Sequence, residues 1–255
     1  MTRTALAATG RLRVEPAPGR QRMHWSQSWP VVLRRTGAEQ VHLVHGAGGP
    51  LGGDDFALEL TVAAGGTLRV GSAGATVVQP GAPGPARWAV RAEVGDGGHL
   101  EWAPEPSVVC DGAALQAELR IRLAAGAGAV LREIAVLGRH GQRGGRYQAD
   151  VTVDVGEQRL LAHRTVLDGA DPELCGPAGT AGARSVGTLV LAGAAATASR
   201  YPDAGDEPGL RWAWTELSGT GWMLLAVGEP RAVVELLDTA TAACRWPAQP
   251  ACDQP

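Results

Sequence analysis

Residues 41–54 read VHLVHGAGGPLGGD, and this stretch decides the fold. The alternation over residues 40–45 predicts a strand with one buried face. The glycines that follow allow positive φ angles and close backbone approach, so they predict one sharply shaped turn. The structural glycines of this turn are Gly48, Gly49, Gly52 and Gly53. We expect the turn to deliver Asp54 to a defined position.

This loop does not match the glycine-rich loops that bind phosphate. A Walker A loop ends in Gly-Lys-Ser/Thr, and the sequence contains no lysine. A dinucleotide fingerprint needs a third glycine opening a helix, whereas Leu51 lies three residues after Gly48 and residues 56–62 alternate as a strand. A hairpin or corner loop whose glycines serve geometry alone remains the simplest interpretation.

Composition indicates a soluble, mainly β protein. A chain of 255 residues suits one domain over residues 1–255, and 36 glycines with 17 prolines favour many short strands and turns. The net charge of −3 and the dispersed arginines give no support for nucleic-acid binding. The apolar runs are too short for a signal peptide or a membrane span, and the cysteines are scattered. We therefore expect a cytoplasmic protein with reduced thiols and no membrane association.

Short alternating segments recur along the chain, and one helix is predicted near its C-terminal end. Residues 230–243 begin with proline and place apolar residues at helical spacing, giving a stripe that packs on the body or on a partner. The turn at residues 63–66 resembles the one at 124–127, as stacked β-coils would produce. The predicted strands are 11–15, 31–35, 40–45, 56–62, 67–70, 76–79, 88–94, 99–102, 116–123, 129–136, 147–155, 158–166, 188–191, 210–217 and 222–227.

The sequence carries no nucleophile elbow, and a spacing of three places His42 and His45 on opposite faces of a strand. What remains is a set of carboxylates beside turns, together with Glu133 in an otherwise apolar strand. Glu133 either sits on the wet face of that strand beside an arginine or lines an internal passage where oxygen ligands hold a divalent ion weakly. The turn carboxylates are Asp54, Asp55 and Glu105.

Four motifs in order over residues 41–147 resemble the urease accessory protein UreD (also called UreH) family. The first is the glycine loop, which is similar to the family's Gly-Gly-x-x-x-Gly-Asp. The turn ending in Ala75-Thr76 comes next, followed by residues 100–106, LEWAPEP, like Leu-Glu-x-x-Pro-x-Pro. The last is Glu133-Ile134 with Gly138-Arg139. The chain departs from the family pattern at Arg132, where tryptophan is usual, at Val77 in place of lysine, and at Gly144-Gly145, where an acid is lost.

The resemblance implies a non-enzymatic protein whose fold is a right-handed coil of β-strands with few helices. It also implies that the protein binds apo-urease and, with UreF and the GTPase UreG, delivers nickel to the urease active site. The accessory complex could contain a homodimer of this chain. On this hypothesis Asp54 and Glu133 lie on the route of nickel in transit, and the helix at residues 230–243 is a candidate partner surface. The alternative is a stand-alone enzyme or ligand-binding β-sandwich with a pocket at the glycine loop and the tryptophans.

Overall fold

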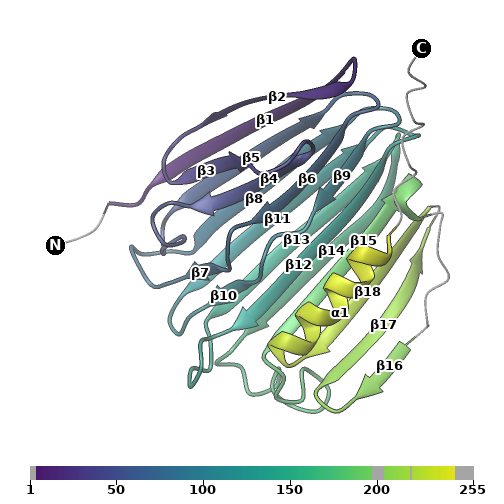
Figure 1. Ribbon diagram of the computed structural model, residues 1–255. Coiled ribbons are helices and arrows are strands. Elements are labelled where there is room, and N and C mark those ends of the chain that lie inside the picture. Colours follow the sequence, from purple (N-terminus) through teal and green to yellow (C-terminus); the bar gives the residue numbers. More distant parts are fainter. Residues whose placement is uncertain (1–3, 197–203, 219, 245–255) are drawn as a thin grey trace.

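In a computed structural model, which describes residues 4–196, 204–218 and 220–244, the chain forms two facing β-sheets (Figure 1). Sheet A has seven strands, in the order β14 (Gln158–Asp168), β13 (Arg146–Val155), β11 (Ala114–Leu123), β8 (Ala86–Val94), β5 (Asp55–Val62), β1 (Ala7–Ala17) and β2 (Arg20–Gln27). Sheet B has eleven strands, and its main path is β16 (Ala204–Glu207), β17 (Leu210–Leu217), β18 (Gly221–Gly228), β15 (Ser185–Gly193), β12 (Gly128–Leu137), β9 (His99–Trp102), β6 (Thr67–Ser72), β4 (Gln40–His45) and β3 (Val31–Arg35). The short strands β7 (Thr76–Val78) and β10 (Ser107–Val109) pair beside β12.

The middle of the chain coils from one sheet to the other, so that successive coils stack in parallel register. Strands β5, β8 and β11 are parallel neighbours in sheet A, and β6, β9 and β12 are parallel neighbours in sheet B. The turns between them stack as well: the carbonyl of Asp96 accepts from the Gly65 amide at 2.9 Å, and its carboxylate accepts from the Gly126 amide at 3.0 Å. The predicted mainly β fold of stacked coils with few helices is confirmed, and so is the echo between residues 63–66 and 124–127.

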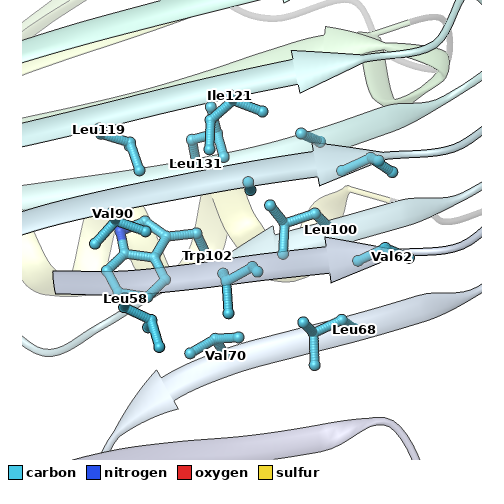
Figure 2. Packing of buried hydrophobic residues seen from close by; sticks show 14 of the residues in the cluster. Leu58, Val62, Leu68, Val70, Val90, Leu100, Trp102, Leu119, Ile121 and Leu131 are labelled. Atoms are coloured by element: carbon cyan, nitrogen blue, oxygen red, sulfur yellow. The ribbon is translucent and has the colours of Figure 1, made fainter. Parts of the chain in front are cut away.

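Alternating side chains fill the space between the sheets, as the strand patterns predict. On β11 the outward row is charged, while Leu119, Ile121 and Leu123 are buried. Figure 2 shows Trp102 among leucine and valine side chains from both sheets. Each such fully buried side chain contributes roughly 1.5–3 kcal/mol by leaving water, so this interior fixes how the coils stack.

Helix α1 (Pro230–Ala243) lies on the outer face of sheet B, over β15 and β12 (Figure 1). Val233 and Leu237 are fully buried and pack with Val130 and Ile134. The apolar stripe therefore packs on the body of the protein, the first of the two predicted alternatives. The 3-10 helix η1 (Ala194–Ala196) follows β15, and no helix in the described ranges is long and apolar enough to cross a membrane.

The largest error of the sequence-based prediction concerns residues 20–27, which form strand β2 but are absent from the predicted strands. Most of this strand is exposed on both faces because β2 is the edge of sheet A, so its sequence lacks the usual apolar alternation. The short strands β10 and β16 were also not predicted. Cys244 is buried where α1 ends.

Candidate functional site

The glycine loop is a corner between the sheets, since β4 belongs to sheet B and β5 to sheet A. Gly49 has φ +117, and a Cβ there would lie 2.1 Å from the carbonyl oxygen of Val77. A Cβ on Gly52 would lie 2.7 Å from the carbonyl oxygen of Ala82. Glycine is thus required at positions 49 and 52 because the corner stacks backbone against backbone on the next coil.

Asp54 fixes this corner. Its side chain is 1% exposed, and its two carboxylate oxygens accept the backbone amides of Leu6 at 2.8 Å and Leu51 at 2.9 Å. The turn therefore delivers Asp54 to a defined position, where it joins the N-terminal segment to the glycine loop. Charge-assisted bonds of this kind are the stronger class of hydrogen bond.

Glu133 lies in the interior between the two sheets. It occupies the same face of β12 as Leu131 and Ala135, which belong to two different apolar clusters of the core. Trp102 Nε1 on β9 donates a hydrogen bond to Glu133 Oε1 at 2.8 Å, and the Tyr147 hydroxyl, from the facing sheet A, reaches Glu133 Oε2 at 3.5 Å. The prediction of a wet-face acid beside an arginine is wrong, because both faces of β12 are covered.

The surroundings of Glu133 change its acid chemistry. Burial raises the pKa of its carboxyl, and the hydrogen bonds from Trp102 and Tyr147 oppose that shift only in part. Burial, followed by the charge of Glu133, raises the pKa of Tyr147 well above its ordinary value. Glu133 is nevertheless the one residue of β12 that is not fully buried. Part of the residue therefore remains accessible to solvent, while its carboxyl group is enclosed by the core.

The neighbouring residue, Arg132, faces the opposite way and holds helix α1. Its guanidinium donates to the carbonyls of Ala103 at 3.1 Å and Pro104 at 2.8 Å, and it forms an ion pair with Asp238 on α1. Those carbonyls directly follow Trp102 in the chain. The segment at residues 102–104 is therefore held from two sides by adjacent residues of β12. Glu133 contacts it in the core, and Arg132 contacts it on the outer face of sheet B.

His45 ends β4 and points into the interior. Its ring lies 5.3 Å from that of Trp88 and 6.4 Å from that of Phe56, both in sheet A. Neither ring nitrogen has a hydrogen-bond partner, and burial lowers the pKa of His45 to about 4. His42 instead bonds to the Thr36 hydroxyl at 2.7 Å, which confirms that the two histidines lie on opposite faces.

The two acids predicted to lie on the nickel route, Asp54 and Glu133, have different hydrogen-bond partners. Asp54 is held at the corner before β5, whereas Glu133 contacts Trp102 and Tyr147 inside the stack of coils. Among the described residues, no three metal-binding side chains come together. Surface hollows of about 590 Å³ over sheet A and about 540 Å³ beside the β16–β17 turn have linings that include neither of these acids nor the glycine loop.

A family model described as UreD urease accessory protein matches residues 7–253. The chain belongs to the UreD family. A relative from Frankia alni, named urease accessory protein UreD, is 38% identical over 94% of this chain and 93% of its own length. A relative of the same name from Streptomyces avermitilis is 44% identical over 64% of this chain and 67% of its own length. Urease accessory protein UreD 3 of Streptomyces griseus is 35% identical over 93% of this chain and its entire length.

The partners of Glu133 in this UreD-family chain were not predicted from the sequence. The predicted strands include Trp102 and Tyr147, but the sequence indicates no function for either residue. Both lie on the inward row of their strands, which alternation does indicate. That their polar atoms meet one acid depends on how the coils stack, and no local pattern encodes this.

Proposed function

We propose that this chain is a urease accessory protein that helps deliver nickel to the active site of apo-urease. It does so as a non-catalytic scaffold, in complex with UreF and the GTPase UreG. The match of the family model to residues 7–253 supports this proposal, as do the relatives, whose names describe an accessory protein of urease. This maturation takes place in the cytoplasm, and the free thiols of Cys110 and Cys175 fit a reducing compartment.

Glu133 is the residue that we assign to the route of nickel. It places a carboxylate between the sheets, in the one residue of β12 that keeps some solvent exposure, and the hydrogen bonds from Trp102 and Tyr147 hold the group in one orientation. One carboxylate offers a divalent cation one or two oxygen ligands, so an ion is held briefly and released. Asp54 contributes indirectly, because both its oxygens are engaged by the backbone of the corner that it fixes.

Complementation of a strain that lacks this gene but retains urease and the other accessory genes tests the proposal. We expect the wild-type chain to restore urease activity and the nickel content of purified urease. Glu133→Gln, which keeps the shape of the side chain, should lower both by about tenfold or more, while the mutant protein still co-purifies with UreF. Normal urease activation in the strain without the gene would defeat the proposal.

The matched control is Glu118→Gln, the same chemical change on the outer face of sheet A. Glu118 pairs with Arg91 at 2.7 Å and Arg120 at 2.9 Å on the surface, where such ion pairs contribute little. Activation should therefore be unchanged in this variant. The mass of the purified complex would show whether two copies of the chain are present.

A further inference from the structure

Glu133 has a polar neighbour on the next strand of sheet B. In the register of β12 with β15, Thr188 lies directly opposite Glu133, so the two side chains share the inner face of the sheet. Along β15, Thr188 is preceded on this face by Val186 and followed by Val190, and these two valines pack with different apolar clusters of the core. Thr188 therefore occupies the boundary between the two clusters, as Glu133 does on β12.

Strand β14 of sheet A shows the same interruption. Its inward row begins with Leu161, which belongs to one apolar cluster, and ends with Leu167, which belongs to the other. His163 and Thr165 lie between these leucines on the same face. Their side chains bond to each other, with His163 Nε2 at 3.0 Å from Thr165 Oγ1. Two polar residues thus stand where apolar residues fill the other strands of this sheet.

The polar parts of β14 and β15 face each other across the interior. Leu161 shares its cluster with Val190, and Leu167 shares its cluster with Val186, so the two strands are aligned at both ends of the interruption. What lies between the leucines on β14 is therefore opposite what lies between the valines on β15. We call the following residues the polar layer: Glu133, Thr188, Thr165 and His163.

The polar layer reaches the surface at the edge of sheet A. Sheet A ends at β14, whereas sheet B continues through β18, β17 and β16 (Figure 1). In the strand register Thr188 is opposite Leu225, which is opposite Ala213. Thr188 is buried, Leu225 is half-buried and Ala213 is exposed, while His163 and Thr165 on β14 are half-buried. Exposure thus increases from the core towards the side that β14 leaves uncovered.

His163 brings an imidazole to this side of the molecule. When its Nε2 donates the hydrogen bond to the Thr165 hydroxyl, Nδ1 carries the lone pair that a cation can bind. Histidines that ligate metals usually donate their other ring N–H to an oxygen in this way, which fixes the orientation of the ring. Imidazole is also a preferred donor for nickel.

We propose that the polar layer is the path of nickel between Glu133 and solvent, and that His163 binds the ion at its outer end; this inference rests on the proposed function. A cation is costly to bring into an apolar interior, and the hydroxyl and carboxylate oxygens of the layer replace part of its water shell. His163 and Glu133 act in turn, and among the described residues no three metal-binding side chains come together to retain the ion.

The test measures the nickel content of urease in the complemented strain, at limiting nickel and at about a hundredfold more nickel. His163→Gln can still bond to Thr165 but lacks the imidazole. We expect its urease to hold about tenfold less nickel than wild type at limiting nickel, and to come within about twofold at high nickel, because mass action compensates for a weakened binding step. The matched control, His140→Gln, makes the same change at an exposed turn and should behave as wild type at both concentrations.

Thr188→Leu is a second variant, which fills the layer with an apolar side chain and leaves both proposed ligands in place. It should lower the nickel content of urease at both nickel concentrations, while the protein still co-purifies with UreF. If this variant no longer co-purifies with UreF, His163→Gln decides alone.

Full loading of urease by His163→Gln at limiting nickel would overturn this inference, as would an equal loss at both concentrations, which indicates a structural role. Normal loading by a Thr188→Leu protein that binds UreF would overturn it as well. In each of these cases a loss of loading in Glu133→Gln would leave the proposed function intact. A wild-type chain that restores no urease activity would defeat the proposed function and this inference together.

Discussion

Trp102 Nε1 donates a 2.8 Å hydrogen bond to Glu133 Oε1 between the two sheets, and the two residues are 31 positions apart in the chain. Strand β9, which carries Trp102, pairs in parallel with β12, which carries Glu133, so the bond joins successive coils of the stack. The coil-on-coil register therefore determines both the structure of the core and the position of its acid. Any change of register would separate the two atoms.

Glu133→Gln should raise the free energy of unfolding at neutral and alkaline pH. The pKa of Glu133 is raised in the folded state, so the stability linked to this group is complete below the unfolded pKa of 4.5 and is lost as the pH rises through the folded value. The stabilising effect of the substitution should therefore be largest at pH 8 and shrink towards pH 4. Urea unfolding at both pH values measures it, and a stability difference that grows towards pH 4 would contradict the burial of this carboxyl group.

Asp54→Ala should destabilise the protein by about 2–4 kcal/mol, because it leaves the amides of Leu6 and Leu51 without their acceptor. Asp54→Asn keeps one oxygen acceptor and should cost less. Asp55→Asn is the matched control, since Asp55 is the next residue and is exposed; its effect should stay within about 0.5 kcal/mol. Equal stability of Asp54→Ala and the control would show that the corner does not depend on Asp54.

Gly49→Ala should be far more harmful than Gly48→Ala, although the two glycines are adjacent. At Gly48, φ is +80 and no atom lies within 4 Å of a built Cβ, so only the left-handed backbone is unfavourable, at about 1 kcal/mol. At Gly49 the Cβ would meet the Val77 carbonyl oxygen at 2.1 Å, which should raise the cost to about 3 kcal/mol. Denaturant midpoints of the two variants measure the difference, and similar values would argue against stacking of the corner on the next coil.

His45 should make the protein sensitive to acid. Its pKa is lowered from 6.5 to about 4 by burial, so the stability linked to it is present above pH 6.5 and lost as the pH falls towards 4. The loss between pH 7 and pH 4 should be about 2–3 kcal/mol smaller in His45→Phe than in the wild type. His140→Phe, at an exposed turn, is the control and should leave the pH profile unchanged. A His45→Phe profile that matches the wild type would refute this role of His45.

Much of the fold could be predicted because most strands have one wet and one buried face. Alternation gave the bounds of β3, β4, β9 and β17, and proline with helical spacing gave those of α1. The method failed at β2, whose exposed residues show no alternation. Alternation also could not show which way Glu133 points, because β12 is covered on both faces and neither face is exposed to solvent.

The candidate site was predicted only in part, since the sequence singles out unusual residues but not their contacts. Glu133 was recognisable as an acid in an apolar strand, and Asp54 as the end of a glycine turn. That Asp54 holds the N-terminal segment depends on a contact 48 residues away.

Because Arg132 and Glu133 are adjacent and face opposite ways, the outside of the protein is mechanically connected to its interior. Asp238 on α1 forms an ion pair with Arg132, and Arg132 donates hydrogen bonds to the two peptide carbonyls after Trp102. The indole of Trp102 in turn donates a hydrogen bond to Glu133. A force that displaces the helix is thus transmitted through three side chains to the carboxylate in the core.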